Sequence, residues 1–106
     1  MAHSFSVEVN NNIAKINLSG RLDAVSAPLL ADELKNLVGK NIAKVVFFAA
    51  DLVYLASAGL RVIIFAKQKI GKSTEVVFVK PQAGIRDVIS MTGFDGFVTI
   101  VDSFAE

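Results

Sequence analysis

The chain has 106 residues, of which 53% are hydrophobic and 20% are charged, so it has enough apolar surface for one compact core. Eleven basic and ten acidic side chains leave a net charge of +1, which argues against an extensive nucleic-acid-binding surface. The absence of cysteine excludes disulfides, thiolate metal ligands and cysteine nucleophiles. We therefore expect a single domain over residues 1–106 whose partners are proteins or small molecules.

The N-terminal residues show no basic segment followed by an apolar stretch, the pattern that marks a signal peptide. The longest apolar run, residues 45–50, is far shorter than the roughly 20 residues that a bilayer-spanning helix needs. From these two observations we expect a cytoplasmic protein that does not insert into a membrane.

The first elements in the chain are predicted to be a β-hairpin and a helix. Apolar and polar residues alternate over residues 5–10 and again over residues 14–19, and Asn11 and Asn12 between them tolerate the positive φ angles of a tight turn. A helix is then predicted from Ser26 or Ala27, with Pro28 in its first turn and with Gly39 after its last apolar residue.

The centre of the chain is predicted to be a buried strand followed by a loop and a second helix. Residues 44–50 are mostly apolar without alternation, as in a strand covered on both faces, and Asp51 is placed in the loop after it. Ser57 comes just before a helical pattern that continues to about residue 70, where its hydroxyl is expected to cap the free N–H groups of the first turn.

Two further units complete the predicted fold. A short strand over residues 75–79 is followed by a helix that ends at Gly93, and residues 98–101 form a last edge strand before Phe104 in a short tail. The predicted order is ββαβαβαβ, an α/β fold with right-handed crossovers between its parallel strands.

Three segments of the chain resemble one known family. They are the Gly-Arg-Leu-Asp turn at residues 20–23, the segment over residues 51–60 that leads into the second long helix, and Thr92, Gly93 and Phe94 at the end of the third helix. In these segments, and in their order and spacing, the sequence resembles the STAS domain family, specifically the bacterial anti-sigma factor antagonists. The resemblance covers almost the whole chain and implies a mixed sheet of about five strands with helices packed mainly on one face.

The resemblance implies a phosphorylation site at Ser57. In that family the matching serine is phosphorylated by a partner that is both an anti-sigma factor and a serine kinase, and the unphosphorylated antagonist binds this partner. The family carries an aspartate directly before the serine, whereas this chain has Ala56. Ala58 after the serine is a residue that the family tolerates. The aspartate that Ala56 replaces is associated in the family with phosphorylation or partner recognition. Its absence therefore concerns the phosphorylation switch more than the fold.

Further residues are candidates for partner binding. Asp23 is implied to be a recognition carboxylate near Ser57, although a turn or cap is an equally good interpretation. Turn chemistry is favoured for Asp51. Val25, Tyr54 and Leu55 are considered as an exposed apolar rim around the serine, with core packing as the alternative for each. Gly59 belongs to the serine-containing motif and completes the candidate set.

An enzymatic function is not expected. A nucleophilic role for Ser57 would need a well-placed base, but the only histidine in the chain is His3, near the N-terminus. The same shortage of ligands argues against a metal site, and no cofactor is predicted. Basic residues near the second long helix are interpreted as a solvated face; they are Arg61, Lys67, Lys69 and Lys72.

The resemblance thus implies a protein-binding switch that acts on transcription through an anti-sigma factor/serine-protein kinase and is controlled by phosphorylation of Ser57. The alternative is a STAS subunit of a transport system, or a module that binds a nucleotide or another anion at the same helix N-terminus. A weak homodimer is left open.

Overall fold

The structure is a computed structural model, and it describes residues 5–70, 74–93, 96 and 98–104. These residues form one sheet in the order β1-β2-β3-β4-β5, with β1 antiparallel to β2 and every later pair parallel. The strands are β1 (Phe5–Asn10), β2 (Ile13–Leu22), β3 (Lys44–Leu55), β4 (Glu75–Val79) and β5 (Thr99–Val101). The mixed five-strand sheet and the order ββαβαβαβ predicted from the sequence are confirmed.

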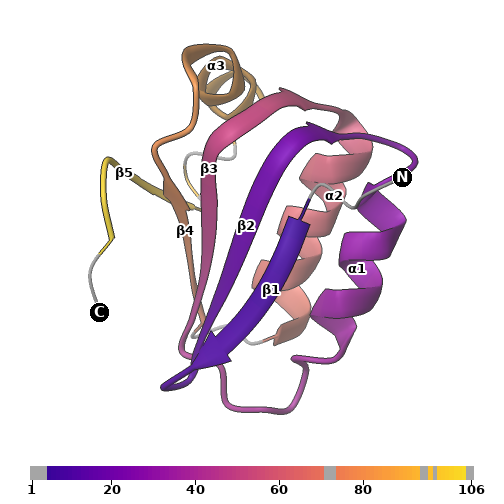
Figure 1. The fold of residues 1–106 in the computed structure, drawn as a ribbon, viewed down its shortest axis with the longest axis vertical. Coiled ribbons are helices and arrows are strands. Elements are labelled where there is room, and N and C mark those ends of the chain that lie inside the picture. Colours follow the sequence, from indigo (N-terminus) through magenta and orange to yellow (C-terminus); the bar gives the residue numbers. More distant parts are fainter. Residues whose placement is uncertain (1–4, 71–73, 94–95, 97, 105–106) are drawn as a thin grey trace.

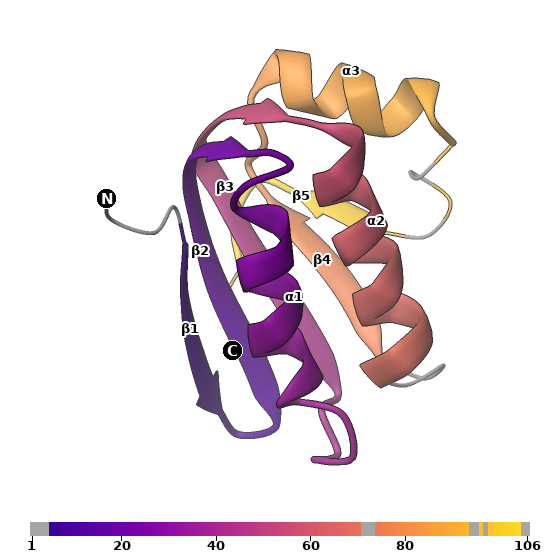
Figure 2. The same cartoon turned by 90° about the vertical axis from the view of Figure 1, so that its right-hand side faces the viewer.

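The helices lie against one face and one end of this sheet. They are α1 (Ala27–Lys35), α2 (Ser57–Phe65), which continues into a π-helical segment η1 (Ala66–Ile70), and α3 (Ala83–Met91). Figures 1 and 2 show α1 and α2 side by side on one face, whereas α3 lies at the end of the sheet where β3 turns into α2. The prediction that the helices pack mainly on one face is confirmed.

The hairpin follows from its two asparagines. Asn11 and Asn12 have φ angles of 55° and 65°, and Asn10 pairs with Ile13 in the antiparallel ladder. Two successive residues in the left-handed region give a turn whose twist matches that of the strands, and asparagine tolerates this conformation better than most residues. The predicted hairpin is confirmed with a two-residue turn.

The central strand β3 is covered on both faces, as its continuous apolar run predicts. Val45 and Phe47 point into the main core beneath the helices, where the Phe47 and Phe78 rings meet edge to face at 5.1 Å. Val46 belongs to a smaller cluster on the opposite face, where Phe104 packs against Phe48. The tail residue Phe104 therefore packs against this face of the sheet.

Two predicted element boundaries are wrong, and one helix ends where it was predicted to end but changes its geometry on the way. The strand β3 continues to Leu55, so Asp51 lies within a strand and not in a loop, because the end of β2 supplies pairing partners as far as Leu22. The helix α1 ends at Lys35 and is followed by turns that include Gly39 at φ 84°. The second helix changes to π-helical geometry after Phe65.

Some residues named above cannot be placed. His3, Lys72 and Phe94 lie outside the described residues, and the side chain of Lys67 is not described. No helix in the described part of the chain combines the length and the hydropathy needed to cross a bilayer.

Gly59 in α2 lies against the ends of two strands. A Cβ atom added there would lie 2.8 Å from Cγ of Leu22 and 2.8 Å from Cδ1 of Leu55, both buried side chains. Any side chain at this position would push α2 away from the sheet. Gly59 was predicted to contact a partner, but the structure buries it and gives it a packing role.

We expect Gly59→Ala to lower the free energy of unfolding by about 1 to 2 kcal/mol. Overpacking a core costs about 1 to 3 kcal/mol, and the better helix propensity of alanine offsets at most about 1 kcal/mol. Urea unfolding measures the change. The control is Gly84→Ala in α3, where no atom lies within 4 Å of the added methyl group, so its stability should stay equal or rise. Equal effects of the two substitutions would contradict this packing role.

Candidate functional site

The end of β2 and the start of α2 are held together by a backbone hydrogen bond. Leu22 pairs with Leu55 at the last position of the β2–β3 ladder, and the Ala56 N–H then donates to the Leu22 carbonyl at 2.9 Å. The turn that follows β2 therefore lies beside the first turn of α2, and Figure 2 shows the two chain segments meeting at this end of the molecule. Residues about thirty positions apart in the sequence form one surface there.

Ser57 is the first residue of α2, and its side chain is exposed. The N-cap is Ala56, in the extended conformation (φ −86°, ψ 166°), and α2 has no side-chain cap. A capping hydroxyl must come from the extended residue that precedes the helix, so the prediction that Ser57 caps α2 is wrong. The Ser57 hydroxyl makes no hydrogen bond with other described residues and is accessible at the positive end of the helix.

Asp23 organises the turn between β2 and α1. Its Oδ1 accepts hydrogen bonds from the N–H groups of Val25 at 3.0 Å and Ser26 at 3.2 Å. The Ser26 hydroxyl in turn donates to the Arg21 carbonyl at 2.9 Å and accepts from the Asp23 N–H at 3.0 Å. The turn interpretation of Asp23 is confirmed. Its backbone hydrogen bonds, first from Ser26 and then from Val25, lower the pKa of the Asp23 carboxyl because they favour the ionised form.

Arg21 links Asp23 to Tyr54 on the protein surface. Its Nε lies 3.4 Å from Asp23 Oδ2, and its guanidinium carbon lies 4.1 Å from the centroid of the Tyr54 ring. This cation–π contact arises because Arg21 and Tyr54 are paired in the parallel ladder. Arg21 was not among the predicted site residues. Its contact with Tyr54 depends on the register between β2 and β3, which cannot be read from the sequence.

The apolar rim predicted around Ser57 is only partly present. Val25 is 79% exposed and Tyr54 is 42% exposed, whereas Leu55 is 6% exposed and belongs to the main core. The prediction of an exposed Leu55 is therefore wrong, because its ladder partner Leu22 faces the same core. Val53, which is 61% exposed on the same strand, was not among the candidates.

Asp51 lies apart from the other candidates. It is exposed, it pairs with Ser19 in the ladder, and it precedes the end of β3 by four residues, roughly 13 Å along an extended strand. The turn chemistry favoured for Asp51 is wrong, because the residue is part of a strand.

The described residues contain no group of three or more histidine, cysteine or acidic side chains arranged to hold a metal ion. One exposed surface at the ends of β2 and β3 and the start of α2 carries Ser57, Asp23, Arg21, Val25 and Tyr54. It combines an accessible hydroxyl, a carboxylate of lowered pKa and exposed apolar side chains.

We expect Ala56→Asp to raise the free energy of unfolding by about 1 kcal/mol, since Ala56 already has N-cap geometry and lacks only an oxygen acceptor. Ala56→Asn should stabilise by a similar amount without adding charge, which separates capping from attraction to the helix dipole. Urea unfolding of the three proteins at neutral pH measures both effects. If neither variant were more stable than the wild type, the description of this helix start would be wrong.

We expect the pKa of the Asp23 carboxyl in the folded protein to lie below its ordinary value of 3.8. A pH titration followed by NMR measures this pKa. The ionised carboxylate holds the turn, so its contribution to stability is present above the unfolded pKa of about 3.9 and is lost as the pH falls through the folded pKa. Asp23→Asn should remove this part of the acid dependence of unfolding. A folded pKa at or above 3.8 would contradict the hydrogen-bonding pattern.

Comparison with known proteins identifies relatives over nearly the whole chain. A family model for the STAS domain matches residues 4–106. The anti-sigma-F factor antagonist RsfB of Mycobacterium tuberculosis is 26% identical over 90 residues, which cover 85% of this chain and 74% of that protein. The putative anti-sigma factor antagonist BtrV of Bordetella bronchiseptica is 32% identical over 87 residues, which cover 81% of this chain and 75% of that protein.

Solved structures agree with these relatives. The structure of an anti-sigma factor antagonist from Mycobacterium paratuberculosis matches with a TM-score of 0.82 and 25% identity, covering 94% of this chain and 86% of that one. A putative anti-sigma factor antagonist from Thermotoga maritima has the same fold, with a TM-score of 0.83 and 22% identity over 96% of this chain and 89% of that one. The resemblance seen in the sequence is confirmed, and the chain belongs to the STAS domain family.

Proposed function

We propose that this STAS domain is an anti-sigma factor antagonist that binds an anti-sigma factor/serine kinase and is released when Ser57 is phosphorylated. The relative from Mycobacterium tuberculosis is named an anti-sigma-F factor antagonist, and the relative from Bordetella bronchiseptica is named a putative anti-sigma factor antagonist. The observation that carries the proposal is the exposed Ser57 side chain at the start of α2, with no hydrogen bond to other described residues. A kinase can reach this hydroxyl without unfolding the domain.

The position of Ser57 explains how one phosphate separates binding from folding. A phosphoserine carries a charge of about −1.5 to −2 at neutral pH, and the positive end of α2 tolerates this charge in the free protein. In a docked complex the same group would bring charge into a desolvated contact. A penalty of about 3 kcal/mol there weakens binding roughly a hundredfold.

The surface beside Ser57 supplies recognition groups. Asp23 uses Oδ1 to hold its turn, while Oδ2 faces Arg21 and is open to competition from a cationic group of the partner. Val25 and Tyr54 supply exposed apolar area next to this carboxylate. Asp51 would contact the partner only at the periphery of such an interface, because it lies four residues before the end of β3.

Leu55 and Gly59 support this surface from inside the domain. Both pack against Leu22, and together they set the distance between α2 and the strand ends that carry Asp23 and Tyr54. Substituting them would change partner binding only through the fold.

The proposal also covers how and where the protein acts and how fast it is phosphorylated. The protein acts by binding and not by catalysis, in the cytoplasm where its kinase and the sigma factor are found. Ala56 stands where the family has an aspartate, so we expect slower phosphorylation than in relatives that retain this carboxylate.

The test compares variants in their affinity for a candidate anti-sigma factor/serine kinase from the same organism, measured by isothermal titration calorimetry. Ser57→Ala should bind like the wild type, whereas Ser57→Asp should bind roughly a hundredfold more weakly. Ser90→Asp is the matched control, because Ser90 is an exposed serine on α3, and it should bind like the wild type.

Two outcomes would overturn the proposal. Equal binding of Ser57→Ala and Ser57→Asp would show that charge at this position has no effect on the complex. Weakening by Ser90→Asp as large as that by Ser57→Asp would show that the effect of charge is not specific to the start of α2.

A further inference from the structure

A groove runs between β1 and α1, away from the Ser57 surface. It has a volume of about 340 Å³ and is lined by Phe5, Ser6, Val7, Leu29, Asp32 and Glu33. Figure 2 shows β1 at the edge of the sheet with α1 between it and α2, so α1 separates the groove from α2. The proposed antagonist function does not use this groove.

One wall of the groove is an open sheet edge. Within the described residues β1 pairs only with β2, and because Asn10 and Ile13 close the two-residue turn, the backbone N–H and C=O groups of Val7 and Val9 point outward. Residues 5–10 contain no proline and no lysine, the residues that commonly block edge strands. An unblocked edge of this kind accepts an extended segment by strand addition.

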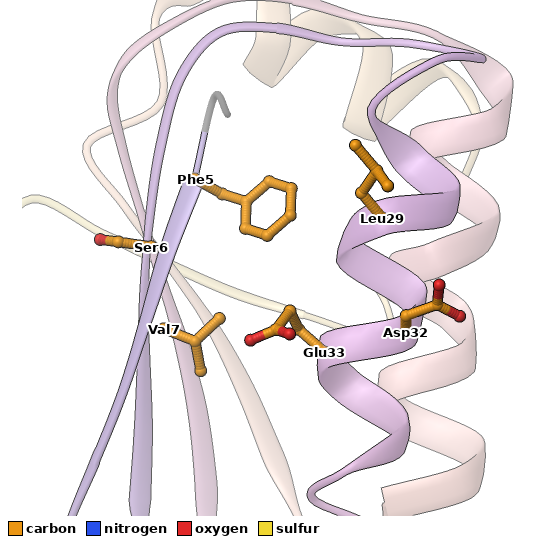
Figure 3. Close-up of a pocket in the computed structure, with 6 residues that line it drawn as sticks. All are labelled: Phe5, Ser6, Val7, Leu29, Asp32 and Glu33. Carbon is orange, nitrogen blue, oxygen red and sulfur yellow. The ribbon is translucent and has the colours of Figure 1, made fainter. Parts of the chain in front are cut away.

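One end of the groove, between Phe5 and Leu29, is lined by apolar side chains. Phe5 and Val7 point from β1 toward α1, while Ser6 points away from the groove (Figure 3). Leu29 faces them from α1 and is 40% exposed. In an added strand, alternate side chains would point into the groove, and one of them would contact Phe5 and Leu29.

The same groove is acidic at its other end. Figure 3 shows the Glu33 side chain turned toward Val7, into the space between β1 and α1. Asp32 lies 3.8 Å from Lys35, whereas Glu33 makes no ion pair with any other described residue. A cationic side chain in the occupant would complement this carboxylate.

A second copy of the chain does not fit this charge. The β1 strand contains no basic residue, so pairing two β1 edges would leave Glu33 of each copy without a cationic side chain from the β1 strand of the other. The charge of the groove instead favours a basic partner.

We propose that the β1–α1 groove binds an extended peptide that adds a strand to β1. The peptide carries an apolar side chain that packs between Phe5 and Leu29, and an arginine or lysine two residues away that pairs with Glu33.

The probe is the seven-residue peptide Thr-Ile-Thr-Arg-Thr-Ile-Thr. It is titrated into the ¹⁵N-labelled protein, and binding is followed by NMR. We expect saturable shifts in the amides of β1 and α1. A peptide with glutamate in place of arginine should bind at least about tenfold more weakly, because it loses a charge-assisted hydrogen bond. Two further peptides carry N-methyl groups on alternate residues, and one of them should lose binding because its blocked amides face β1.

Two protein variants test the role of Glu33. Glu33→Lys should weaken binding of the arginine peptide at least about tenfold and should favour the glutamate peptide. Asp87→Lys makes the same change of charge on α3 and should leave binding unchanged. Both residues are exposed, and the NMR spectrum of each variant confirms its fold.

Several results would overturn the proposal. The first is the absence of amide shifts in β1 at peptide concentrations up to about millimolar. The second is equal binding of the two N-methylated peptides, and the third is an unchanged affinity of Glu33→Lys for the arginine peptide. Shifts confined to the start of α2 would also overturn it. Concentration-dependent pairing of β1 edges without peptide would identify a second copy as the occupant and contradict it.

Discussion

The structure depends on the joint between the end of β2 and the start of α2. One backbone hydrogen bond, from Ala56 N–H to Leu22 O at 2.9 Å, joins the two segments. Gly59 lets α2 lie directly on Leu22 and Leu55, because any Cβ atom at this position would collide with both side chains. This close approach fixes where Ser57 emerges relative to the turn that contains Asp23. A displacement of α2 would separate the hydroxyl from the carboxylate.

The rest of the candidate site is built on this joint from short-range contacts. Asp23 and Ser26 hold the turn after β2 through hydrogen bonds to each other and to the backbone, so the turn has its own support. Arg21 connects the turn to Tyr54 on the neighbouring strand. A hydroxyl on a supported surface of this kind can gain a charge without a change of fold. This property suits a switch that works by excluding a partner.

Much of the fold could be predicted because it depends on local patterns. The alternation around Asn11 and Asn12 predicted the hairpin, the apolar run at residues 45–50 predicted the central strand, and three short segments identified the family. The errors arise where long-range pairing decides the outcome. Asp51 lies in a strand because β2 extends to pair with that part of β3, and Leu55 is buried because Leu22 is its partner. Arg21 is part of the site for the same reason, since its contact with Tyr54 follows from the strand register. Ser57 fails as a cap because Ala56 is the residue in the extended conformation.

The most direct test of the account is the site of phosphate transfer. The protein is incubated with its candidate kinase and ATP, digested with trypsin and analysed by mass spectrometry. Cleavage after Lys44 and Arg61 releases residues 45–61, in which Ser57 is the only serine and no threonine is present. Tyr54 is the only other residue of this peptide with a side-chain hydroxyl, and fragment ions distinguish a phosphate on Ser57 from one on Tyr54. The account predicts phosphate on Ser57. Tight binding of the kinase with no phosphate on this peptide, or phosphate on another serine, would contradict it.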